Sequence, residues 1–187
     1  MGVNEEFVWL AVGRIVPAKD YPNLLRAFSR VHAVIPAARL WVAGEAPATG
    51  LMPVQALAAE LGVEASVRWL GLRSDMPALL DAADAFVSAS AWEGMPLAVG
   101  EAMAMEKPVV ATDVGGVREL LGECGVMVPA KAPAALAQAM LTLMQTTPQA
   151  RSSLGRAARE RMQRQFSFDV KADEWESLYR VMLAHSH

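Results

Sequence analysis

The sequence is poor in the two residue types that most often build cross-links and transition-metal sites. It contains one cysteine, Cys124, and three histidines among 187 residues. A single cysteine excludes an internal disulfide and a multi-cysteine metal site, and it fits a reducing cytoplasm, which is where we expect the protein to work. None of the histidines falls in a loop that we single out as a candidate site, so we predict no metal.

The sequence also lacks an excess of positive charge and long apolar runs. Seventeen Lys and Arg stand against 20 Asp and Glu, for a net charge of -3, which gives no basic field for nucleic acid or anionic lipid. Five arginines cluster in residues 151–164, but Glu160 interrupts them, and we interpret that segment as a solvated helix. No stretch approaches the roughly 18 to 20 apolar residues that cross a membrane. We expect no nucleic-acid partner and no transmembrane segment, which leaves peripheral membrane association of a longer parent chain open.

A dinucleotide fingerprint is missing as well. A NAD-binding unit has Gly-x-Gly-x-x-Gly after its first strand. Here the first apolar run, residues 7–12, is followed by Gly13 alone and then by a long loop that carries cations. This absence argues against NAD, and we expect no cofactor.

Short apolar runs alternate with helical patterns along most of the chain. The predicted strands are residues 7–12, 39–43, 67–70, 85–87, 109–112 and 125–128. Helices are predicted between them; Asp20 is placed to cap the first, whose core face carries Leu24, Leu25, Phe28 and Val31. Such alternation predicts an α/β fold with a doubly wound, Rossmann-like parallel sheet of about six strands and helices on both faces. No repeat or linker divides the chain, so we predict one domain over residues 1–187.

The segment 84–108 organises the rest of the sequence. It passes from a strand through a loop of small residues into a helix that opens at Pro96, and Gly94 lets the backbone approach a ligand closely. The amides and the dipole at such a helix start favour an anion. Between residues 96 and 105 the only charged side chain is Glu101, so we expect a buried carboxylate that needs donors or a cation. Glu93 adds a second carboxylate; the alternative is a solvated Glu93 and a structural ion pair for Glu101.

The loop after the first strand supplies positive charge. It carries Gly13, Arg14 and Lys19. Because doubly wound sheets bind ligands at the carboxyl ends of their strands, this loop and the helix at Gly94 are expected at one edge. Two cations there would complete a diphosphate site, with Arg14 gripping by its planar fork and Lys19 acting as a point charge. The alternative is that both are ordinary exposed loop residues.

The same two segments carry a family resemblance. Residues 93–104 read Glu-Gly-Met-Pro-Leu-Ala-Val-Gly-Glu-Ala-Met-Ala, and residues 12–19 read Val-Gly-Arg-Ile-Val-Pro-Ala-Lys. They resemble the Glu-x7-Glu and Gly-Arg…Lys motifs of the group 1 retaining glycosyltransferases. The resemblance spans about residues 7–183 and is to the C-terminal, donor-binding half of an enzyme with two Rossmann-like domains.

The resemblance implies a role for each matching residue. Glu101 would accept hydrogen bonds from the ribose hydroxyls, Glu93 would lie near the donor sugar, and Arg14 and Lys19 would neutralise the diphosphate leaving group. Backbone groups near Leu72 and Arg73 would contact the base; the alternative is that residues 70–75 are an ordinary strand-to-helix connection. The amides at the helix mouth would orient sugar and phosphate; these belong to Gly94, Met95, Pro96 and Leu97, although Pro96 stands where many relatives have a glycine and has no N–H to donate.

The resemblance also implies the function. The chain would bind a nucleotide-diphosphate sugar for retaining, hexosyl-type transfer to a saccharide or lipid acceptor in polysaccharide or glycolipid biosynthesis. Its partners would be that donor and the N-terminal acceptor domain of the same parent, without which we expect no transfer. Alternatives are half of a sugar-nucleotide epimerase or phosphorylase, and a non-catalytic nucleotide-binding module.

A final helix, about residues 168–184, is predicted at the end of the chain. Its apolar side chains fall at i, i+3, i+4 and i+7 and form a stripe of Trp175, Leu178, Tyr179 and Met182. The resemblance implies that this helix crosses toward the N-terminal domain, which would leave part of the stripe exposed here. The alternative is that the stripe covers this domain's own sheet, with Phe166 and Phe168 as anchors.

Overall fold

The computed structural model describes residues 6–47 and 50–184, and its centre is a parallel sheet. Six strands lie in the order β3-β2-β1-β4-β5-β6, and each neighbouring pair is parallel. This confirms the predicted α/β class and the predicted positions of the strands to within one residue. The strands are β1 Phe7–Val12, β2 Ala38–Ala43, β3 Val67–Gly71, β4 Ala85–Ser88, β5 Val109–Thr112 and β6 Val126–Val128.

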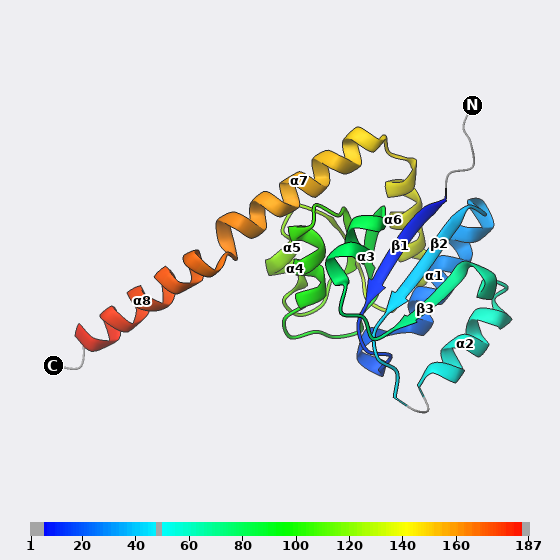
Figure 1. The fold of residues 1–187 in the computed structure, drawn as a ribbon, viewed down its shortest axis with the longest axis horizontal. Coiled ribbons are helices and arrows are strands. Elements are labelled where there is room, and N and C mark those ends of the chain that lie inside the picture. The colour runs from blue at the N-terminus through cyan, green and yellow to red at the C-terminus, as the bar shows by residue number, and fades with distance from the viewer. Residues whose placement is uncertain (1–5, 48–49, 185–187) are drawn as a thin grey trace.

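Helices cover both faces of the sheet (Figure 1). One face packs against α1 Tyr21–Val34, α2 Leu51–Glu60 and α6 Pro133–Gln145. The other packs against α3 Met76–Ala82, α4 Leu97–Ala104 and α5 Val117–Leu121. Alternate residues of β1 serve the two layers, since Trp9 belongs to the first apolar cluster and Leu10 to the second. This two-sided burial explains why the strands read as continuous apolar runs.

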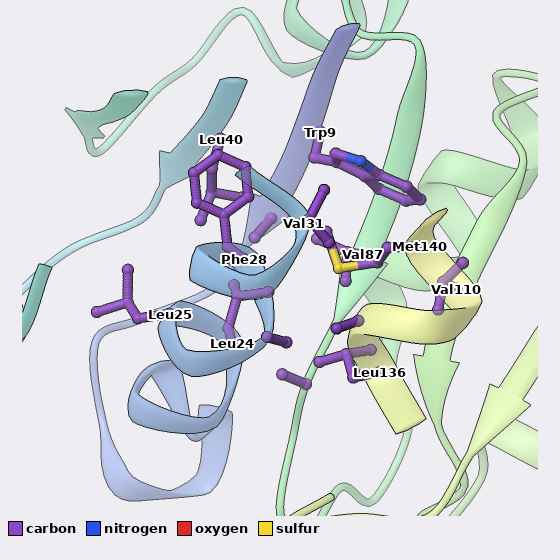
Figure 2. Close-up of a cluster of buried hydrophobic side chains, with 14 of the residues drawn as sticks. Trp9, Leu24, Leu25, Phe28, Val31, Leu40, Val87, Val110, Leu136 and Met140 are labelled. Atoms are coloured by element: carbon purple, nitrogen blue, oxygen red, sulfur yellow. The ribbon is translucent and has the colours of Figure 1, made fainter. Parts of the chain in front are cut away.

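The larger apolar cluster forms where α1 and α6 pack on the central strands. Figure 2 shows Phe28 of α1 near Leu40, and Leu136 and Met140 of α6 on the side of Val110. The whole predicted core face of α1 is fully buried: Leu24, Leu25, Phe28 and Val31 each expose 1% or less. Burial of this stripe fixes α1 on the sheet and, with it, the loop that precedes α1.

The strand order creates a switch point between β1 and β4. From β1 the chain builds outward through β2 and β3, and it then returns to place β4 on the other side of β1. The loops that leave β1 and β4 therefore diverge over opposite faces at the carboxyl edge of the sheet, which is where doubly wound sheets place a ligand crevice. The two segments singled out from the sequence, residues 13–20 and 89–96, are these loops.

Two long helices follow the sheet, α7 Pro148–Gln165 and α8 Phe168–Ala184. The interpretation of the arginine-rich segment as a merely solvated helix is wrong in part. Arg161 of α7 donates to the carbonyls of Glu119 (2.6 Å) and Leu120 (2.9 Å), at the end of α5. A cation at a helix C-terminus satisfies carbonyls that have no partner in the helix, so this arginine attaches α7 to the domain.

The last helix, α8, projects away from the domain (Figure 1). No residue of α8 is buried, and the expected exposure of its apolar stripe is observed: Trp175 is 57% exposed and Leu178 47%. Phe166 is half-buried against the second apolar cluster, as expected of an anchor. The expectation that Phe168 also anchors the helix is wrong, because its side chain is 86% exposed.

Asp20 offers a direct test of how the cation-bearing loop is joined to α1. Its side chain accepts a hydrogen bond from the Asn23 amide (3.2 Å), and its φ is +45°. Asp20→Ala is expected to lower the free energy of unfolding by about 1 to 2 kcal/mol, because it removes a helix cap at a position where alanine is strained. Asp20→Asn keeps the acceptor and tolerates this φ. Urea unfolding measures both, and equal stabilities of the two variants would contradict the capping role.

Candidate functional site

The loops after β1 and β4 are tied to each other by a backbone hydrogen bond from the Ala91 amide to the Ala18 carbonyl (2.8 Å). The first loop is also tied to the start of α1, where the Tyr21 hydroxyl donates to the Gly13 carbonyl (2.7 Å). Burial raises the pKa of the Tyr21 phenol well above its usual range, so this group stays a donor. The loop that begins at Gly13 is therefore held against the loop that leads to Glu93.

An ion pair forms where these loops meet. Lys19 Nζ contacts Glu93 Oε1, with side chains 25% and 12% exposed respectively. The sequence predicted that both residues lie at one mouth; it did not predict that they pair. The same carboxylate oxygen accepts from Ser90 Oγ (2.7 Å), and Ser90 is a residue that the sequence reasoning missed. The only signal for it was a hydroxyl three residues before Glu93.

A third loop, the turn after β5, packs against the backbone of Glu93 and Gly94. The Gly116 amide donates to the Gly94 carbonyl (3.1 Å). At Gly115, φ is +48°, and a Cβ atom built there would overlap the Glu93 carbonyl oxygen. The turn after β5 therefore needs glycine both for its conformation and for close approach to the Glu93 backbone.

Glu101 lies in a different environment from the one that we predicted. The prediction that its carboxylate is buried is wrong: Glu101 is exposed, on a face of α4 that it shares with Leu97 and Ala104. Leu97 is itself 70% exposed. Two hollows adjoin this face, one of about 400 Å³ that reaches Met162 and Phe166 and one of about 270 Å³ beside Met76, Pro77 and Leu80. The apolar residues of α4 thus divide between the core and an open surface.

The remaining predicted residues lie along the same edge of the sheet but are not brought into one cluster. Arg14 is exposed, and its side chain makes no hydrogen bond or ion pair within residues 6–47 and 50–184. Leu72 is 79% exposed, and Arg73 forms a two-point ion pair with Asp75 at 2.8 and 2.6 Å. The hydrogen bonds and charge of this contact raise the pKa of Arg73, and the hydrogen bond from Arg73 lowers that of Asp75. Both residues follow β3, two strands away from β1.

The start of α4 differs slightly from the prediction. The helix begins at Leu97, and buried Pro96 precedes it as the N-cap residue. The Leu97 amide donates to the Met95 carbonyl (3.0 Å), so a ligand would compete with that contact for the donor. Gly94 and Met95 are exposed at the mouth.

Within residues 6–47 and 50–184, no three His, Cys, Asp or Glu side chains are grouped so that they could hold a metal ion. Nor is any of the described helices both long and apolar enough to cross a membrane.

The chain is similar to proteins of one family. Residues 6–146 match the family model described as glycosyl transferases group 1. A D-inositol 3-phosphate glycosyltransferase of Segniliparus rotundus is 34% identical over 178 residues, which cover 92% of this chain and 39% of that protein. The chain spans less than half the length of the curated relatives that it matches.

Solved structures of similar fold agree with this match. The HepE protein of Anabaena, crystallised with UDP and glucose, aligns with a TM-score of 0.85 and 26% identity over 94% of this chain and 49% of its own. Sucrose-phosphate synthase of Thermosynechococcus elongatus aligns with a TM-score of 0.86 and 28% identity over 98% of this chain and 47% of its own.

Proposed function

This chain belongs to the group 1 glycosyl transferases, and from that premise we propose that it binds the nucleotide-diphosphate sugar from which a hexosyl group is transferred. The observation that carries the proposal is the meeting of Lys19, Glu93 and the start of α4 at the crevice between β1 and β4. Cation, carboxylate and helix N-terminus are the groups that a diphosphate linked to a sugar requires. The transfer itself, with retention at the anomeric carbon and in the biosynthesis of a polysaccharide or glycolipid, is proposed for the whole parent protein.

Each residue has a distinct part in this proposal. Arg14 and Lys19 bind the diphosphate, Glu93 accepts hydrogen bonds from the donor sugar, and Glu101 accepts them from the ribose hydroxyls. The exposure of Glu101 supports its part, because a carboxylate buried in the core would be out of reach of a ligand. The backbone at Leu72 and Arg73 would contact the base at the far end of the same edge.

The chemistry is electrostatic. As the glycosidic bond breaks, negative charge grows on the departing diphosphate. Cations and amides already fixed in place stabilise that charge at little cost of reorganisation. Lys19 is neutralised by Glu93 in the free protein, so donor binding must draw its ammonium at least partly toward the phosphates. In this proposal the chain's own cations do the work, and no metal is needed.

Direct binding tests the proposal. Calorimetry of the 187-residue chain with UDP, GDP and ADP should show that one of them binds more tightly than its free nucleoside. UDP is the first to try, since HepE, a relative in fold, was crystallised with it. Failure of all three to bind would overturn the proposal. If the full-length parent, incubated with a donor sugar, yielded an epimerised sugar, the reaction would be epimerisation and not transfer.

Glu101→Gln is expected to weaken binding of the matching nucleoside diphosphate by about 10- to 100-fold, the effect of losing a hydrogen bond to a charged acceptor. The fold should be unaffected, because the side chain is exposed. Glu60→Gln, at an exposed position of α2, is the matched control and should bind as the unmodified chain does. Unchanged affinity in Glu101→Gln would show that the ribose contact is assigned to the wrong residue.

A further inference from the structure

Ser90 is a buried hydroxyl group that faces the candidate site. It is 1% exposed, and it lies in the loop between β4 and Glu93. Its Oγ donates to Glu93 Oε1 (2.7 Å), while its carbonyl accepts a hydrogen bond from buried Thr112 Oγ1 (2.7 Å). Ser90 is thus fixed from β5 on one side and directs its hydroxyl to the carboxylate on the other.

The bonds to Glu93 are unequally divided between its two oxygens. Lys19 Nζ and Ser90 Oγ both donate to Oε1. Glu93 Oε2 makes no hydrogen bond or ion pair with any residue of the described ranges 6–47 and 50–184. One oxygen is therefore held by the protein, and the other is left to accept from a ligand.

The two donors to Oε1 differ in what a ligand would do to them. Lys19 is a flexible, partly exposed cation that a diphosphate competes for. Ser90 has no such competitor, because it is buried and out of reach of a ligand. Once Lys19 turns toward the phosphates, Ser90 is the side chain that still fixes the orientation of Glu93.

We propose that Ser90 is a positioning residue that keeps Glu93 Oε2 directed at a hydroxyl group of the donor sugar. The inference rests on the proposed function and deepens it. It assigns to Ser90 the part of the binding that depends on the sugar ring and not on the nucleotide. A free Glu93 carboxylate would sample several rotamers, and ordering it on binding would cost side-chain entropy.

The test separates nucleotide from sugar. Calorimetry of Ser90→Ala with UDP should give a dissociation constant within about twofold of the unmodified chain, whereas UDP-glucose should bind about tenfold more weakly, the equivalent of one hydrogen bond. The same comparison is made for GDP with GDP-mannose and for ADP with ADP-glucose. The test uses the nucleotide and sugar conjugate that the unmodified chain binds most tightly. Equal losses for nucleotide and nucleotide sugar, or no loss for either, would overturn the inference.

A matched control and a second genetic background distinguish positioning of Glu93 from a general structural effect of the substitution. Ser88→Ala removes a hydroxyl that shares a hydrogen bond with Ser90 Oγ (3.3 Å) but makes none to Glu93 in the described chain, and it should leave the ratio of the two affinities unchanged. In a Glu93→Ala background, Ser90→Ala should have no further effect on that ratio, since Ser90 acts through Glu93. A further loss in that background would overturn the inference.

Two further outcomes also decide between the inference and its failure. Should Ser90→Ala fail to fold by circular dichroism, Ser90→Cys keeps the size of the side chain and a weaker donor; it should lower the relative affinity for UDP-glucose by less than tenfold, and an unchanged ratio would count against Ser90. If the unmodified chain binds none of UDP, GDP and ADP, the proposed function fails, and this inference fails with it.

Discussion

Reversal of the charge at Arg14 is expected to weaken binding of a nucleoside diphosphate by at least about a hundredfold, because a charge-assisted contact to phosphate is replaced by repulsion. Binding of the free nucleoside should change little, since the nucleoside carries no phosphate. The unfolding free energy should also be unaffected. Arg14 is exposed and makes no side-chain hydrogen bond or ion pair in the part of the chain described by the structure, so Arg14→Glu breaks nothing in the free protein.

Lys19→Glu is the companion experiment, and the structure predicts that this variant also loses stability. It should weaken diphosphate binding at least as much as Arg14→Glu does, and it also places a second carboxylate against Glu93, whose side chain is 12% exposed. Like charges at a partly buried site repel strongly. We therefore expect Lys19→Glu to lower the midpoint of urea unfolding as well as the affinity, whereas Arg14→Glu should lower the affinity alone.

Arg30→Glu serves as the control for net charge, because Arg30 is exposed on α1 and is not part of the proposed site. It changes the charge of the protein by the same amount and should bind the diphosphate as the unmodified chain does. Calorimetry on the three variants, with UDP and uridine as ligands, decides the matter. Equal losses for nucleotide and nucleoside in Arg14→Glu would place Arg14 away from the phosphates.

The strands, the helices and the site edge could be predicted from the sequence because their signals are local. Continuous apolar runs such as residues 7–12 mark strands covered on both faces, and the stripe on α1 marks its core face. The position of the crevice then follows from topology, because parallel strands end at one edge. Capping of α1 by Asp20 was equally local and is confirmed by its bond to the Asn23 amide.

The exposure of Glu101 could not be predicted in the same way. An α4 that is apolar or small at almost every position looks like a core helix, yet Leu97 and Ala104 lie beside Glu101 on its exposed face. An apolar side chain in a sequence does not indicate what will cover it. The sequence alone therefore cannot distinguish an apolar helix face that lines an open surface from one that packs on a sheet.

The contacts of Glu93 depend on pairings that no local pattern encodes. Lys19 and Glu93 are 74 positions apart, and their meeting depends on which rotamers the two loops allow. Arg161 shows the same limit, because its bonds to the end of α5 join residues 41 and 42 positions apart. The charge pattern predicted the location of Lys19 and Glu93 at one edge of the sheet. It did not predict their partners, which depend on how the loops pack.

The exposed apolar stripe on α8 raises the question of whether another domain covers this helix. Trp175 and Tyr179 are each 57% exposed, and no residue of α8 is buried. Contiguous apolar side chains of this kind usually mark a surface that another unit covers. The prediction that the helix crosses toward an N-terminal acceptor domain stays a prediction, and the exposure of the stripe agrees with it.

We expect the 187-residue chain to bind nucleotide but to transfer no measurable sugar. Transfer requires an acceptor hydroxyl held against the anomeric carbon with water excluded, and such positioning can supply about 7 to 11 kcal/mol of the barrier. The proposed donor site is an open edge with Arg14, Gly94 and Glu101 exposed to solvent, and in this proposal it provides one wall of a cleft.

The measurement follows radiolabelled UDP-glucose, or the conjugate that binds most tightly, with saccharide and lipid acceptors over hours. The full-length parent is the positive control, and its Glu101→Gln variant tests whether transfer depends on the proposed donor site. Product from the isolated chain at a rate near that of the parent would show that the 187 residues form a complete catalytic unit. Binding without product, together with transfer by the parent, is the expected result, because the positioning energy comes from the wall that faces this crevice.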